Sequence, residues 1–125
     1  MRAVHHYFAF FVAASNLLVG GYAIWRHRRK LPPTRALWTG VVVAWVSVLV
    51  QGVMGLALFQ RYKPPFKHTF YGFLFVVVML LVWPLRGEND RTRQLVFGAA
   101  TLFIGIVAVR AIFSYTPQPV FGLGP

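Results

Sequence analysis

The chain has 125 residues, of which 58% are hydrophobic and 12% charged, and Glu88 and Asp90 are its two acidic residues. A soluble domain of this length needs far more surface charge, so the composition excludes an ordinary soluble domain and indicates a protein embedded in lipid. The net charge of +11 does not indicate nucleic-acid binding, because the basic residues lie between long apolar runs and not along one helix face. The absence of cysteine excludes thiolate metal sites and cysteine nucleophiles.

Four apolar segments have the roughly 20 residues that a helix needs to cross about 30 Å of hydrocarbon. In chain order they span about 4–25, 35–59, 66–85 and 94–113. The connections RHRRKLPPT and QRYKPPFK are short and contain paired prolines, so we expect consecutive helices to be antiparallel neighbours. The sequence therefore predicts an all-α integral membrane protein, an up-down bundle of four transmembrane helices. It forms one domain over residues 1–125 and ends in an extended tail at 114–125.

The basic residues are divided unequally between the two ends of this predicted bundle. One end carries Arg26, Arg28, Arg29, Lys30, Arg35, Arg86, Arg91 and Arg93, and the other carries Arg2, Arg61, Lys63 and Lys67. The positive-inside rule places the richer end in the cytoplasm. Both termini are therefore expected outside.

Small and polar residues recur every three or four positions in the first two segments. They are Ala9, Ala13, Asn16 and Gly20 in the first, and Gly40, Ala44, Ser47, Gln51 and Gly55 in the second. Membrane helices approach each other closely through such residues, and their polar side chains bond across the contact. We expect both lines to face the interior, with the amides of Asn16 and Gln51 bonded to each other or to a carbonyl.

Three histidines and one arginine fall at nearly the same outer depth in this topology. His5 and His6 begin the first helix, His68 begins the third, and Arg110 comes about one turn before the outer end of the fourth. Haem b requires two neutral imidazoles from different helices at matched depth, with small residues beside them. His5 or His6 paired with His68 meets that requirement, and Gly72 gives room for the porphyrin. The cations available for its propionates are Arg110, Arg2, Lys63 and Lys67.

Two other interpretations of the same residues remain. His5, His6 and His68 are suitable ligands for one copper or zinc ion. Adjacent helical residues diverge by about 100°, however, so His5 and His6 reach one metal only if the helix begins after them. Alternatively, the histidines and Arg110 are interfacial residues and no cofactor binds.

The segments HHYFAFF, QGVMGLAL, KHTFYGF and VAVRAIF resemble those of small four-helix membrane proteins of the cytochrome b kind. The histidine, tyrosine and glycine that open the third segment are also similar to those of small bacterial membrane proteins. The resemblance implies haem held between histidines of neighbouring helices, in a bacterial cytoplasmic membrane. Cytochromes that carry electrons across the bilayer have a second histidine pair near the other face, where this chain has only His27.

Two functions follow from these observations. The first is an electron-transfer subunit of a respiratory or photosynthetic complex, which exchanges electrons with a quinol, a partner subunit or an extracytoplasmic cytochrome. The second is a cofactor-free structural or assembly subunit packed against larger membrane partners. An independent enzyme is not indicated, because no nucleophile and base pair or paired acid is visible.

Overall fold

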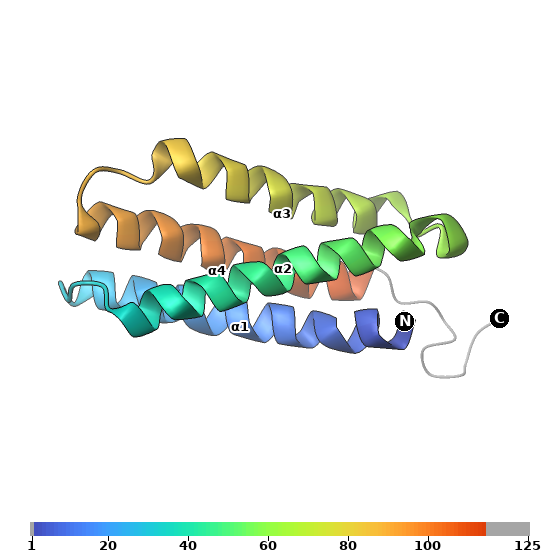
Figure 1. Ribbon diagram of the computed structural model, residues 1–125, viewed down its shortest axis with the longest axis horizontal. Coiled ribbons are helices and arrows are strands. Elements are labelled where there is room, and N and C mark those ends of the chain that lie inside the picture. Colours follow the sequence, from blue (N-terminus) through green and yellow to red (C-terminus); the bar gives the residue numbers. More distant parts are fainter. Residues whose placement is uncertain (1, 115–125) are drawn as a thin grey trace.

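A computed structural model describes residues 2–114 as four α-helices. They are α1 (Arg2–Arg28), α2 (Arg35–Tyr62), α3 (Phe66–Leu85) and α4 (Asp90–Ser114). All four are long and apolar enough to cross a membrane, so the predicted all-α membrane bundle is confirmed. The helices alternate in direction, so that the start of α1, the α2–α3 connection and the end of α4 lie at one end (Figure 1). Ser114 ends α4, and the rest of the predicted tail, 115–125, lies outside the described residues.

Local sequence sets the helix ends at the connections. The hydroxyl of Thr34 accepts a hydrogen bond of 3.1 Å from the backbone N–H three residues later and so caps α2. Lys63 ends α2 in the left-handed conformation with a φ of 41°, and Pro65 stands at the N-cap of α3. The side chain of Asn89 caps α4 through a 2.8 Å bond from the N–H of Thr92. α1, α2 and α4 extend beyond the predicted apolar segments, because hydropathy marks only the part of a helix that spans the hydrocarbon.

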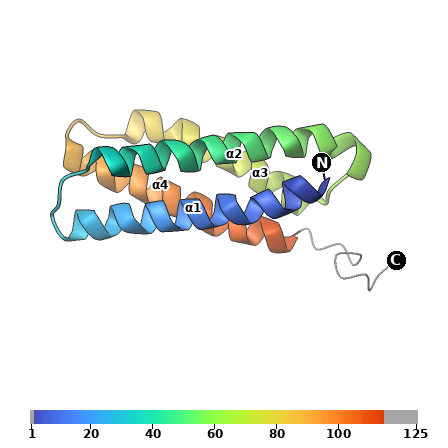
Figure 2. The same ribbon diagram turned by 60° about the horizontal axis from the view of Figure 1, so that its bottom comes forward.

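The helices do not pack as a ring of sequential neighbours. α1 packs most extensively along α4, α2 packs on α1, and α3 packs on α4, as the two side views also show (Figures 1 and 2). α2 and α3 hardly contact each other, although they are consecutive and antiparallel. The expectation that all consecutive helices are neighbours is therefore wrong for this pair. The three residues between α2 and α3, 63–65, hold the adjoining ends of the two helices close together and leave their middles free to diverge.

Glycines allow the close approach of α1 and α4. A Cβ atom built on Gly20 would overlap the backbone nitrogen of Leu102, and one on Gly105 would lie 2.7 Å from the backbone nitrogen of Leu17. A Cβ on Gly98 would lie 2.8 Å from that of Ala23. The two backbones are thus in direct contact, which is the packing expected where lipid provides no hydrophobic drive between helices.

The small and polar lines of α1 and α2 face the interior, as predicted. Asn16 is fully buried, and its Nδ2 donates to the carbonyls of Val12 at 2.8 Å and Ala44 at 3.2 Å. The Nε2 of Gln51 donates to the carbonyl of His5 at 2.8 Å. Both amides therefore bond a carbonyl across the α1–α2 contact.

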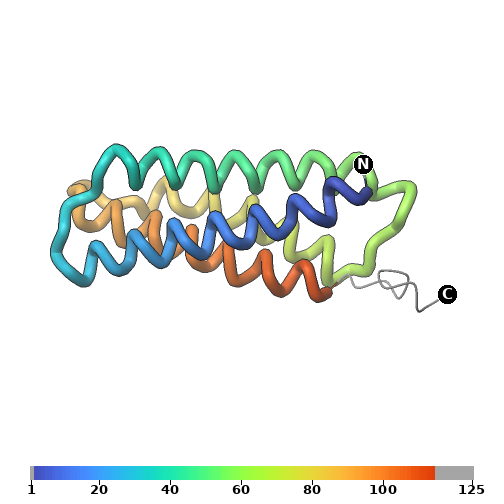
Figure 3. Tube along the Cα trace, turned by 90° about the horizontal axis from the view of Figure 1, so that it is seen from below, coloured from blue at the N-terminus to red at the C-terminus, as the bar shows by residue number. Residues whose placement is uncertain are grey.

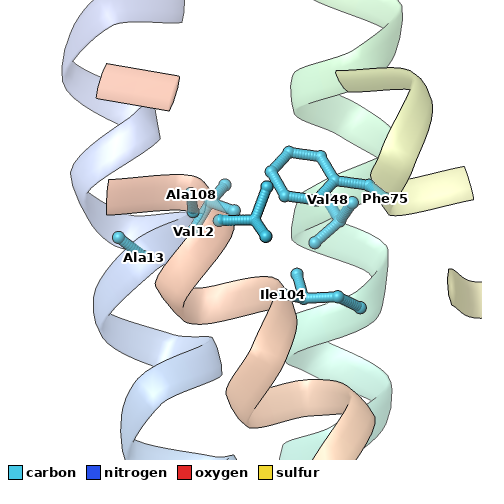
Figure 4. Packing of buried hydrophobic residues seen from close by; sticks show 7 residues of the cluster. Val12, Ala13, Val48, Phe75, Ile104 and Ala108 are labelled. Atoms are coloured by element: carbon cyan, nitrogen blue, oxygen red, sulfur yellow. The ribbon is translucent and has the colours of Figure 1, made fainter. Parts of the chain in front are cut away.

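The apolar core joins all four helices near the middle of the bundle. Figure 4 shows Val12 and Ala13 of α1, Val48 of α2, Phe75 of α3, and Ile104 and Ala108 of α4 converging at this level; Val107 belongs to the same cluster. Phe75 is the α3 member of this buried cluster, and four partly buried side chains of α3 pack against it: Tyr71, Leu74, Val78 and Met79. Between the core and the end that holds the start of α1, the helices line the site described next.

Candidate functional site

A cavity of about 710 Å³ lies between the four helices in the half of the bundle that includes the start of α1 and the α2–α3 connection. Its floor is the core itself, because Val12, Val48, Phe75 and Ala108 belong both to the core and to the cavity wall. Most lining side chains are apolar. The volume falls within the range of roughly 300–1,000 Å³ that is typical of ligand pockets.

His5 and His68 face each other across this cavity. His5 comes from the first turns of α1 and His68 from the first turn of α3, and both helices begin at the same end of the bundle (Figure 3). The ring centroids are 6.2 Å apart, and the ring planes make an angle of 77°. Both side chains are half-buried. The matched depth predicted from the sequence is thus found for this pair.

α2 provides the space for the His5 ring. A Cβ atom on Gly55 would lie 3.1 Å from the Cε1 of His5, so the imidazole rests against the backbone of α2 at this glycine. One turn earlier, Gln51 holds the backbone of His5 through the 2.8 Å bond to its carbonyl. A glycine and an amide from one helix therefore position a histidine of the next.

α4 orients the His68 ring. Its Nδ1 lies 3.1 Å from the backbone carbonyl of Ala111, which can only accept a hydrogen bond. The tautomer that donates from Nδ1 has its basic lone pair on Nε2. A backbone carbonyl on one ring nitrogen is the usual way of fixing a histidine whose other nitrogen binds a metal.

Two buried polar atoms in the cavity wall lack a hydrogen-bond partner among the described residues. They are the Nδ1 of His5 and the Oε1 of Gln51. A buried polar atom without a partner costs about 1–3 kcal/mol. Such atoms are unfavourable in a purely structural core and are typical of a wall that faces a ligand or ordered water.

The other predicted site residues lie in different surroundings. His6 lines the cavity, but its ring packs edge-on against Tyr7 at 5.1 Å and Phe10 at 5.7 Å between centroids. Gly72 lines the cavity, and a Cβ atom there would meet nothing within 4 Å. Arg110 is exposed on α4 and is not among the residues that line the cavity.

The three-histidine metal site is not assembled. α1 already begins at Arg2, so His5 and His6 are both helical and their side chains diverge. Within residues 2–114, no group of three or more histidine, cysteine or acidic side chains is placed to hold a metal ion. A pair of imidazoles, His5 and His68, is what the fold brings together.

Arg2, one of the cations that the sequence suggested for this end of the bundle, lines the cavity, and two further lining residues are not evident from the sequence. The guanidinium of Arg2 lies 4.7 Å from the ring centroid of Tyr62 and forms a cation–π pair at the end of the cavity away from the core. Gly52 lines the wall on α2, and Thr69 does so on α3. The only signal for Gly52 is its spacing of three residues from Gly55, which by itself indicates helix packing and not a cavity.

These features define a four-span helical integral membrane protein with a mainly apolar cavity, two facing imidazoles and a cation at the end of the cavity away from the core. Comparisons with protein-family models, with curated proteins and with solved structures find no match to the chain.

Proposed function

We propose that this chain is a small subunit of an energy-converting membrane complex, respiratory or photosynthetic, in which His5 and His68 hold one haem b near the outer membrane face. The observation that carries the proposal is the facing pair of imidazoles, from two helices that do not pack together, above a floor of core side chains.

The short distance between the two rings would let both imidazoles hold one metal centre. Metal–nitrogen bonds to histidine measure about 2.0–2.1 Å, so two imidazoles that held one metal would lie close together. The His5–His68 separation is 6.2 Å. The two ring planes make an angle of 77°, so the imidazoles meet edge to face.

The walls agree with an amphiphilic, flat ligand. Gly52 and Gly72 offer backbone without side chains on two sides of the cavity, and the buried Nδ1 of His5 lacks a partner. At the outer end, Arg2 provides a positive charge and Tyr62 a hydroxyl, which suit carboxylates. The sequence suggested both Arg2 and Arg110 for this role, and we assign it to Arg2, because Arg2 lines the cavity and Arg110 does not.

When bound, haem b supplies one-electron transfer between its ferric and ferrous states. In this scheme His5 and His68 would hold the haem. Gln51 fixes the backbone of His5, and the carbonyl of Ala111 fixes the tautomer of His68. The core floor excludes water from below.

A single haem near one face would exchange electrons with partners on that side. It would not by itself carry electrons across about 30 Å of hydrocarbon. The end that carries His5 and His68 has fewer basic residues than the opposite end, so the positive-inside rule places it outside the cytoplasm. There it would exchange electrons with a quinol, a cofactor of a partner subunit or an extracytoplasmic cytochrome.

The test is a dithionite-reduced minus oxidised absorbance spectrum of the detergent-purified protein, with haem and metal analysis of the same sample. We expect paired α and Soret bands at about one haem per chain, lost in His5→Ala and in His68→Ala. His27→Ala is the matched control, since His27 lies at the opposite end of α1 and does not line the cavity. A flat spectrum of the wild-type protein would reject the redox function and favour the cofactor-free structural subunit.

A further inference from the structure

The cavity has a side opening that faces the lipid. Because α2 and α3 hardly contact, the wall between them is incomplete, and some of its residues both line the cavity and are exposed. Val53 and Leu56 of α2 are 68% and 76% exposed, and Val76 of α3 is 46% exposed. In a four-span membrane protein, apolar side chains exposed at this depth face acyl chains.

α2 and α3 each contribute one exposed glycine to the cavity wall. Gly52 and Gly72 both line the cavity and are both exposed, and a Cβ atom on either would meet nothing within 4 Å. Their absence of side chains is therefore not required by packing, unlike that of Gly20 against α4. A glycine inside a helix is unfavourable by roughly 0.8–1.0 kcal/mol relative to alanine. Gly52 and Gly72 differ from an ordinary helical glycine in that they line the cavity, so a larger side chain at either position would narrow the opening.

The end of the cavity away from the core differs from the side opening, because polar side chains lie there. Arg2 of α1 lies over the ring of Tyr62 at the end of α2, with 4.7 Å between the guanidinium carbon and the ring centroid. Pro64 of the α2–α3 connection lines the same end. Polar groups thus span the aqueous end, whereas the lipid side is flanked by glycines.

We propose that the gap between α2 and α3, flanked by Gly52 and Gly72, is a lateral portal through which an amphiphilic ligand enters the cavity directly from the bilayer. The identity of that ligand as haem rests on the proposed function; the portal itself does not. A flat apolar molecule with an anionic edge partitions into the membrane, enters with its apolar part between the helices, and places its anionic edge at Arg2.

The absence of native cysteine allows a direct test. Ala108 is 4% exposed and lines the cavity from α4, so Ala108→Cys places one thiol inside it. Ala9→Cys is a second reporter on α1, in case the first does not fold. The protein is reconstituted in vesicles without haem, and labelling rates are measured with a membrane-soluble alkyl maleimide and with a charged, membrane-impermeant thiol reagent.

We expect the alkyl maleimide to label the reporter and the charged reagent to label it at least about tenfold more slowly. Adding Gly52→Leu and Gly72→Leu together should slow labelling by the alkyl maleimide by about tenfold or more. Gly21→Leu is the matched control, since Gly21 is also helical, a Cβ there meets nothing within 4 Å, and it does not line the cavity. It should leave the rate unchanged.

Three results would overturn the portal: faster labelling by the charged reagent, no labelling of either reporter by either reagent, or an unchanged rate in the Gly52→Leu/Gly72→Leu variant. Circular dichroism and the elution volume of each variant show whether it is folded. Because no haem is present in this assay, a missing Soret band would reject the haem proposal and leave the labelling result standing.

Discussion

Gly20 and Gly21 are adjacent in α1 but have opposite surroundings, and this contrast yields a sharp prediction. A Cβ atom on Gly20 would overlap backbone atoms of Leu102, whereas one on Gly21 would meet nothing within 4 Å. The backbone of α4 cannot yield as a flexible side chain would, so Gly20→Ala must push α1 and α4 apart. Overpacking of this kind costs about 1–3 kcal/mol.

Helix propensity opposes that cost to a small extent. Replacing glycine by alanine inside a helix contributes roughly 0.5–1 kcal/mol in water, and less in a membrane, where the helices persist after they separate. We therefore expect Gly20→Ala to lower the free energy of unfolding by about 1–2 kcal/mol. Gly21→Ala should leave it unchanged or raise it slightly.

The assay is unfolding in mixed micelles with increasing sodium dodecyl sulfate, followed by tryptophan fluorescence and circular dichroism, for both variants and the wild-type protein. A loss in Gly20→Ala and none in Gly21→Ala would confirm that α1 and α4 are in backbone contact. Equal stabilities would refute the reasoning, because they would mean that the two backbones are not in contact at Gly20.

Three further predictions concern the site and its support. His6→Ala should keep its bound haem in the reduced-minus-oxidised spectrum, since His5 and not His6 faces His68. Gly55→Val should weaken haem binding at least about tenfold in a titration of the apoprotein. A Cβ atom at position 55 would lie 3.1 Å from the Cε1 of His5, so the two methyl groups of valine would displace the imidazole ring. Unchanged affinity would exclude His5 as a ligand. Thr101→Val removes the 2.9 Å bond from the Trp45 indole and should cost about 0.6 kcal/mol in the same unfolding assay, and a loss several times larger would contradict a merely local role.

The sequence was sufficient for the architecture because the bilayer limits the solutions. A backbone in hydrocarbon must satisfy its own hydrogen bonds, so each apolar run of about 20 residues becomes a helix. α3 spans Phe66–Leu85, the segment expected from hydropathy, because Pro65 at its N-cap precedes the first helical residue and polar residues follow the last. The inward lines through Asn16 and Ser47 were equally readable, since small and polar residues at helical spacing avoid lipid.

Part of the site was also readable from the chain. His5 and His68 each begin a helix that runs in the same direction, so an alternating topology necessarily brings them to one depth. The sequence could not choose between His5 and His6, because that choice depends on which face α1 turns toward α3. The structure places His5 against Gly55 and opposite His68.

What only the tertiary structure decided is which helices touch. Periodicity identifies a packing face but not its partner, and the contact of Gly20 and Gly105 with the opposite backbone depends on a register between α1 and α4 that no local pattern encodes. That close contact, together with the packing of α2 on α1 and of α3 on α4, separates α2 from α3. The cavity between the four helices follows from this separation. Hydropathy determined that there are four helices, and the steric fit of glycines between them determined where the cavity lies.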